Sequence, residues 1–207
     1  MSGAAMDNQE TSHEGHARPA MKKHPLGQSW TLWFDNPSNK QKMDNFGETL
    51  RKIYTFETVE DFWCIQHNIA LPSMLRPNCD IHLFKGGISP TWEDPKCENG
   101  GRWTINIPKS GGDRMLNDGW LDAMLACIGE MFDDMDDVCG VVCNIRNKGN
   151  RVCLWTSSAN KKSLQQSMGR QLKHIMGLAV TEKISYLAHS DARKIAQSSR
   201  VADLYVV

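Results

Sequence analysis

Short apolar stretches with the alternation of half-buried strands recur along the chain, bounded by Gly, Pro, Asn and Asp. The segments at 138–145 and 151–156 are joined only by Arg146-Asn-Lys-Gly-Asn150, a hairpin-length loop with a turn glycine. A parallel pair would need a much longer crossover, so the pattern favours an antiparallel sheet. The predicted strands are 30–34, 81–84, 103–107, 138–145, 151–156 and 183–187.

Three other segments carry apolar positions at helical spacing. The first starts at Thr58-Val-Glu-Asp61, where the threonine oxygen can accept from the backbone N–H of Asp61. The second is a stripe over 121–128, and the third runs over 164–176 with Gly177 as its C-cap. Because these helices are interleaved irregularly with the strands, we predict an α+β fold with the helices on one face of the sheet.

Composition is that of one globular domain, with 40% apolar and 23% charged residues. We expect a disordered N-terminal tail over 1–23 and a single domain over 24–207. No run of 18 apolar residues and no secretory signal is evident, so no membrane contact is expected. Seven cysteines without a C-x-x-C pair are interpreted as small buried hydrophobes of a reducing compartment, which favours the cytoplasm.

Charge and aromatic content narrow the candidate chemistry. Lys plus Arg equals Asp plus Glu, at 24 each, which argues against wrapping long nucleic acid through phosphate contacts alone. Seven tryptophans beside three tyrosines instead suggest a stacking site.

The segment from Pro90 to Pro95 presents Trp92 and Glu93 on a stiffened loop. An indole face suits a cationic purine, and a carboxylate can accept two hydrogen bonds from a guanine edge. The alternative is that Trp92 packs into the core and Glu93 is solvated. Candidate phosphate-binding cations are Arg102, Arg146, Lys148 and Arg151, and for each the alternative is a solvated surface charge.

Metal and catalytic sites are not predicted. The acidic run over 130–137 lacks the spacing and the glycine of a calcium loop and is interpreted as a solvated loop. The histidines show no zinc-binding pattern, and no cofactor is expected. Hydrolysis of a nucleotide would need clustered carboxylates or a nucleophile with a base, which we do not find. We therefore expect that the protein has no catalytic residue and is not an enzyme.

From residue 24 onward the chain resembles the eukaryotic translation initiation factor 4E family, whose members bind the 5′ cap of messenger RNA. Eight motifs in order carry the resemblance: His24-Pro-Leu26, Trp30-x-x-Trp33-Phe34, Thr58-Val-Glu-Asp-Phe-Trp63, Trp92-Glu-Asp94, Gly100-Gly-Arg-Trp103, Cys139-Gly-Val-Val142, Arg146-Asn-Lys148 and Leu154-Trp155-Thr156. The resemblance implies a curved antiparallel sheet of about eight strands, with three helices on its convex face.

The resemblance also implies the roles of the cap-binding residues. Phe46 and Trp92 would sandwich the 7-methylguanine, Glu93 would bind its Watson–Crick edge, and Trp155 would contact the N7-methyl region. Phosphates would be held by Arg102, Arg146 and Arg151, with Lys148 near. Translating members usually carry tryptophan where this chain has Phe46, so stacking there should be weaker by about 0.5–1 kcal/mol.

A second implied site is a convex groove for a partner helix of the form Tyr-x-x-x-x-Leu-φ, carried by the initiation scaffold factor 4G and by 4E-binding proteins. Its implied residues are His24, Pro25, Leu26, Val59, Trp63, Leu121, Asp122 and Leu125. The alternative is that its apolar members are ordinary helix–sheet core. Exposure of Trp63 would favour an interface. The other tryptophans, at 30, 33, 103 and 120, are interpreted as structural, and Ser199 is the predicted phosphorylation position.

Two functions within this family remain open. The first is a monomeric, non-enzymatic factor that recruits capped messenger RNA to the initiation machinery in the cytoplasm, with a second pool in the nucleus. The second is a cap-binding repressor or message-storage protein, suggested by Phe46. Retention of Trp30 argues the other way, so the chain mixes both patterns.

Overall fold

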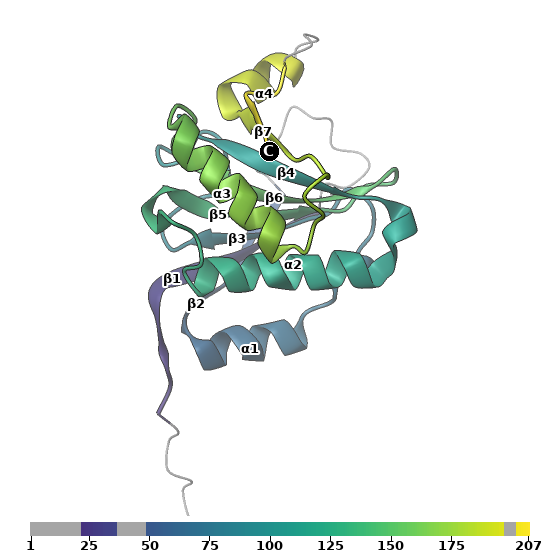
Figure 1. Ribbon diagram of the computed structural model, residues 1–207. Coiled ribbons are helices and arrows are strands. Elements are labelled where there is room, and N and C mark those ends of the chain that lie inside the picture. The colour runs from purple at the N-terminus through teal and green to yellow at the C-terminus, as the bar shows by residue number, and fades with distance from the viewer. Residues whose placement is uncertain (1–21, 37–48, 197–201) are drawn as a thin grey trace, which may run out of the picture.

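The computed structural model describes residues 22–36, 49–196 and 202–207, and nothing is inferred about the placement of the rest. Its centre is one antiparallel sheet of eight strands in the order β2-β1-β3-β5-β6-β4-β7-β8 (Figure 1). The strands are β1 (Pro25–Asp35), β2 (Leu50–Thr58), β3 (Asp80–Lys85), β4 (Gly101–Ile107), β5 (Val138–Asn144), β6 (Asn150–Thr156), β7 (Ser185–Ala188) and β8 (Tyr205–Val206). The six predicted strands are confirmed, as is the hairpin between β5 and β6.

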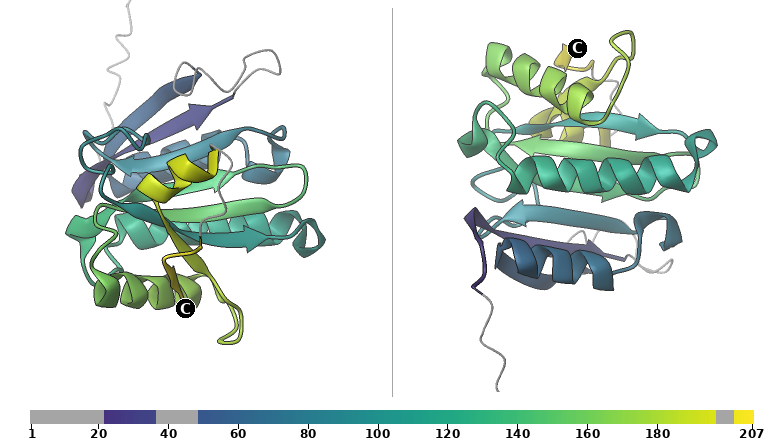
Figure 2. Two further views of the ribbon diagram at one scale, coloured as in Figure 1. Left: turned by 90° about the horizontal axis from the view of Figure 1, so that it is seen from above. Right: turned by 60° about the horizontal axis from the view of Figure 1, so that its bottom comes forward.

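Helices α1 (Val59–Asn68), α2 (Gly112–Ile128) and α3 (Lys162–Ile175) lie together against one face of the sheet (Figures 1 and 2). The predicted Thr58 cap is confirmed, since its Oγ accepts from the N–H of Asp61 at 3.2 Å. Gly177 follows α3 with φ of 63°, a left-handed conformation that suits glycine. Short 3₁₀ turns occupy Pro72–Met74, Lys109–Gly111 and Met135–Asp137.

A fourth helix, α4 (His189–Ala196), was not predicted. Ala192 on α4 borders a cavity on the opposite face of the sheet, so the helices are not all segregated to one side. No helix within the described ranges combines the length and the apolar character needed to cross a membrane.

Alternation along the strands divides the sheet into two faces. On β3, Ile81 and Leu83 enter the main core beneath the three helices. The intervening Asp80 and His82 face the other side, where they line the cavity. Trp30, Trp103 and Trp120 are fully buried, which confirms their structural interpretation, whereas Trp33 is half-buried beside a second cluster around Phe84 and Trp155.

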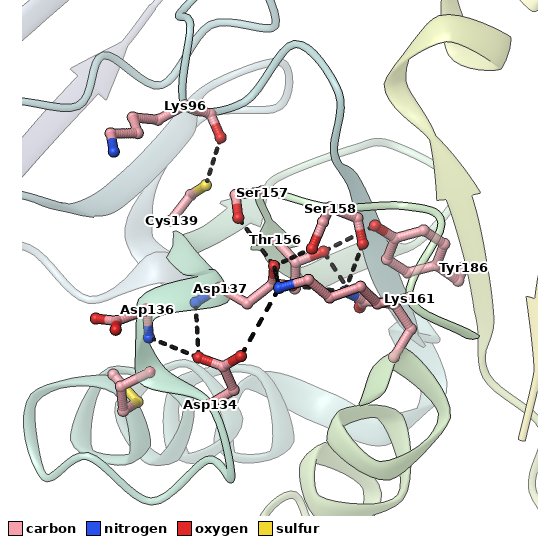
Figure 3. Close-up of polar contacts among 12 residues, drawn as sticks. Lys96, Asp134, Asp136, Asp137, Cys139, Thr156, Ser157, Ser158, Lys161 and Tyr186 are labelled. Atoms are coloured by element: carbon pink, nitrogen blue, oxygen red, sulfur yellow. Dashed lines mark hydrogen bonds and ion pairs between the residues drawn. The ribbon is translucent and has the colours of Figure 1, made fainter. Parts of the chain in front are cut away.

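The interpretation of residues 130–137 as a solvated loop is wrong for Asp137, whose side chain is fully buried and makes the polar contacts drawn in Figure 3. Its carboxylate accepts from Ser157 Oγ at 2.9 Å, from Ser158 Oγ, and from Gln165 Nε2 at 2.6 Å, and Lys161 Nζ lies 3.5 Å away. The donors come from the two residues that follow β6, from the residue before α3 and from the first turn of α3. Asp137 therefore ties these two elements to the start of β5.

The cysteine prediction needs one correction. Six of the seven thiols are buried, but Cys64 on α1 is exposed because it lies on the outer side of that helix. Burial raises the pKa of the Cys127 thiol to about 12, as expected of an inert core residue.

Candidate functional site

A cavity of about 290 Å³ opens on the face of the sheet away from α1, α2 and α3. Four strands, the loop after β3 and helix α4 contribute to its wall. Among the described residues, the lining consists of Asp80, His82, Pro90, Trp92, Arg102, Val142, Asn144, Arg146, Arg151, Trp155 and Ala192. Five of the eight predicted cap-binding residues are thereby brought to one place, namely Trp92, Trp155 and the three arginines.

The loop that carries Trp92 is closed by Asp94. Its carboxylate accepts from the backbone N–H of Ser89 at 2.8 Å and from that of Lys96 at 2.9 Å. These two hydrogen bonds close the loop, and the half-buried Trp92 lies at the rim of the cavity. Glu93, next in the chain, is exposed and is not among the lining residues. Its contact with a guanine edge stays a prediction.

Trp155 is held rigidly on β6. Phe84 meets it edge-on with ring centroids 5.5 Å apart, and the His189 ring on α4 lies 4.2 Å away. The indole is only 8% exposed, yet it lines the cavity. It is therefore a fixed aromatic wall and does not need to reorganise to meet a ligand.

Three guanidinium groups of the described residues lie around the cavity, and they differ in burial and in how firmly other side chains hold them. Arg146 forms two hydrogen bonds with Asp80, Nη1–Oδ1 at 2.6 Å and Nη2–Oδ2 at 2.9 Å. Burial opposes the charged form of Arg146, but the hydrogen bonds and charge of Asp80 outweigh it, so its pKa is raised. Arg102 is half-buried and Arg151 is exposed. Lys148 is exposed and does not line the cavity, so its role stays a prediction.

The predicted partner surface lies on α1, α2 and the start of β1, on the opposite face (Figure 2). His24 is tied to the first turn of α1 by its ring Nδ1 and backbone N–H, 2.6 and 2.8 Å from the Glu60 carboxylate. The hydrogen bonds from His24 lower the pKa of Glu60. Lys23 similarly meets Asp61 at 2.6 Å. These contacts align the His24-Pro25-Leu26 segment with α1.

Trp63 is half-buried, not mostly exposed. It packs edge-on against Phe62 at 5.0 Å and stacks on His67 at 5.7 Å. Leu26, Leu121 and Leu125 likewise contact the core while remaining partly exposed, and Val59 is 37% exposed. The same side chains thus contribute to the core and leave an apolar strip at the surface, and their role in binding a partner stays a prediction.

Asp122 is half-buried on α2, and burial followed by the charge of Asp118 raises the pKa of its carboxyl. A partly desolvated carboxylate beside an apolar strip suits a cationic group on an incoming helix.

Comparisons with known proteins agree with this geometry. A family model described as eukaryotic initiation factor 4E matches residues 25–203. The chain is 44% identical over 184 residues to the translation initiation factor isoform 4E of Arachis hypogaea, covering 89% of this chain and 88% of the relative. The chain belongs to the initiation factor 4E family.

Solved structures of the initiation factor 4E family superpose on the fold. Ascaris suum eIF4E-3, solved with an m2,2,7G cap, has a TM-score of 0.82 at 34% identity, covering 90% of this chain and 99% of that one. A schistosome eIF4E, complexed with m7GpppG and 4E-BP, has a TM-score of 0.79 at 31% identity, covering 89% and 99%. The predicted fold, one antiparallel sheet of eight strands with three helices on one face, is confirmed.

Two predicted positions of this factor 4E chain, Phe46 and Ser199, lie outside the described residues. The second half of the stacking sandwich and the phosphorylation position thus stay predictions, as does the tail over residues 1–23, of which 1–21 are also outside.

Sequence reasoning missed Asp80, Asp94 and His82. The acid of Trp92-Glu-Asp94 belonged to a recognised motif, but nothing in it indicated that this carboxylate closes the loop. Asp80 and His82 flank apolar residues in a predicted strand, and only the register of β3 shows that they face the cavity.

Proposed function

We propose that this chain binds the 7-methylguanosine cap of messenger RNA in the cavity between Trp92, Trp155 and the three arginines. The observation that carries the proposal is the convergence of two indole rings and three guanidinium groups in one cavity. A cationic purine gains from an aromatic face, and guanidinium forks match phosphate oxygens. The relatives solved with m2,2,7G cap and with m7GpppG support the same ligand class.

Tryptophan fluorescence tests the proposal directly. Titration with 7-methyl-GTP should quench the emission at concentrations well below those needed for GTP, because only the methylated base carries the positive charge that strengthens stacking. Equal quenching by both nucleotides would contradict cap recognition. Incubation of 7-methyl-GTP with the protein and magnesium should leave the nucleotide intact, since we propose a binding protein and not a hydrolase.

We further infer that the strip formed by Val59, Trp63, Leu121 and Leu125 receives a Tyr-x-x-x-x-Leu-φ helix of the initiation scaffold factor 4G or of a 4E-binding protein. A helix-in-groove contact of this kind uses leucines at helical spacing. The schistosome relative in complex with 4E-BP supports a partner of this class. Capture of the factor 4G peptide by immobilised protein tests it, and no capture would contradict it.

A repressor or storage role is the second candidate, and Phe46 is the observation that favours it. Expression in cells depleted of their own cap-binding factor separates the two roles. Rescue of translation supports recruitment to the initiation machinery, whereas cap binding without rescue supports repression. We expect the protein to be a monomer. We also expect it in the cytoplasm with a second pool in the nucleus, and imaging of tagged protein would test this location.

A further inference from the structure

His82 lies in the middle of β3, on the floor of the cavity. It is opposite Trp33 on β1 and Val142 on β5, and it is 6% exposed. Neither ring nitrogen has a hydrogen-bond partner within the part of the chain that the structure describes. Buried polar groups are nearly always paired, and leaving one unpaired is costly. The structure thus leaves two buried polar atoms of this imidazole unsatisfied beside the cavity.

The imidazole is neutral. Burial lowers its pKa to about 4; the charge of Asp80 works against this shift, and that of Arg146 adds to it. Among the residues that the structure describes, the other charged groups lining the cavity are Arg102 and Arg151, and both disfavour a further cation. A neutral imidazole presents one N–H donor and one acceptor nitrogen.

The position of His82 along β3 indicates which part of a ligand it would meet. Residues on the same face of a strand are about 7 Å apart, so His82 lies one step from the Asp80–Arg146 pair. In the other direction β3 leads to the loop that carries Pro90 and Trp92. A nucleotide whose base contacts Trp92 and whose outer phosphates contact the arginines would place its first phosphate between them.

We propose that His82 is a ligand-contact residue that donates a ring N–H to the phosphate nearest the sugar of the bound cap. This inference rests on the proposed function. A phosphate oxygen is favoured over a sugar hydroxyl because hydrogen bonds to charged acceptors contribute more. His82 thereby determines how much affinity the first phosphate adds.

The test compares 7-methylguanosine with 7-methyl-GMP on the wild type, on His82→Phe and on His82→Gln. The ratio of the two affinities measures the gain from the first phosphate. In His82→Phe, which keeps a ring but no donor, the ratio should shrink by about tenfold. His82→Gln keeps a side-chain N–H donor and should restore most of the ratio. Affinity for 7-methylguanosine should change by less than about twofold in either variant.

An unchanged ratio in His82→Phe would overturn the inference. Equal losses for both ligands would also overturn it, because they would indicate a packing role or a contact with the base or sugar. The proposed function is tested separately, by titrating the wild type with 7-methyl-GTP and with GTP. Equal affinities for the two nucleotides would contradict the proposed function. The nucleoside-to-monophosphate ratio would still report on His82 in that case.

Nuclear magnetic resonance on the wild type gives a result that does not depend on folding of the variants. With ¹⁵N-histidine, a ring N–H of His82 protected from exchange should appear on addition of 7-methyl-GMP and not of 7-methylguanosine. Protection with both ligands, or with neither, would contradict a phosphate contact.

Discussion

The Asp80 carboxylate holds the Arg146 guanidinium in one orientation at the edge of the cavity, through parallel contacts of 2.6 and 2.9 Å. Asp80 is 8% exposed and Arg146 33% exposed, so this pair is less screened than a surface ion pair. Arg146 also donates to the carbonyl of Ile145 at 2.9 Å. These contacts fix the conformation of the Arg146 side chain, so the remaining edge of the guanidinium is already positioned at the cavity.

Arg146→Lys should therefore weaken binding of 7-methyl-GTP by about tenfold, because a lysine keeps the charge but cannot fork between Asp80 and a phosphate. Fluorescence titration measures the change. Arg114→Lys is the matched control, since Arg114 is 94% exposed and pairs with Asp118 on the outer side of α2. Equal effects of both substitutions would argue against a fixed phosphate-binding arginine.

Trp92→Ala and Trp63→Ala should separate the two proposed sites. Trp92→Ala removes a stacking face worth about 1–3 kcal/mol and should abolish retention on immobilised 7-methyl-GDP while peptide capture persists. Trp63→Ala should do the reverse, losing the Tyr-x-x-x-x-Leu-φ peptide but not the cap ligand. Circular dichroism checks that both variants remain folded. Loss of both activities from either folded variant would mean that the sites are not independent.

Much of the fold could be predicted because β5 and β6 lie in continuous apolar runs and the core-facing Ile81 and Leu83 of β3 recur with the period of a strand. Strand β2 could not, because it lies at the edge of the sheet and residues 51–55 are all exposed, so no alternation exists to detect. Helix α4 has eight residues and β8 two, too short for a periodic signal.

Residues of the site could be predicted from the sequence only where they belong to a recognised family motif. The roles of Asp80, His82 and Asp137 depend on contacts made by residues far away in the sequence, such as Arg146 for Asp80 and Gln165 for Asp137. Their local sequence is compatible with solvent exposure. Register and packing, not residue type, decide that these groups are buried.

Gly169 on α3 lies where the helix approaches Trp103 most closely. A Cβ at this position would lie 2.7 Å from the indole Cζ2, and Trp103 itself is fully buried. Gly169→Ala should therefore destabilise the protein by about 1–3 kcal/mol, despite the better helix propensity of alanine. Gly149→Ala is the control, because among the described residues its Cβ would meet nothing within 4 Å except a carbonyl oxygen at 3.6 Å. Thermal unfolding compares them, and a stabilised Gly169→Ala would show that α3 can move away.

Asp137→Asn should lower the free energy of unfolding by about 2–4 kcal/mol. The amide cannot accept from Ser157, Ser158 and Gln165 together, which leaves buried donors unpaired. Urea denaturation measures the loss. Asp118→Asn on the exposed side of α2 should change the stability by no more than about 0.5 kcal/mol. If the two variants proved equally stable, Asp137 would not be the tie between β5, β6 and α3.

The buried His82 should make the ligand-free protein acid-sensitive. Its pKa is about 4 in the folded chain against an ordinary value of 6.5, so between these values the unfolded state binds the extra proton. Its contribution to stability is therefore fully present above pH 6.5 and is lost as the pH falls towards 4. By pH 5 the loss from this group alone is about 2 kcal/mol.

His82→Gln removes that group while keeping a polar side chain of similar reach. The stability of the wild type should therefore fall more steeply than that of the variant between pH 6.5 and 5, with the difference measured by urea unfolding at each pH. Other titrating groups are shared by both proteins and cancel in the comparison. Parallel curves would mean that His82 keeps an ordinary pKa, in which case its ring would already be paired or hydrated, and the cavity floor would have no free donor for a phosphate.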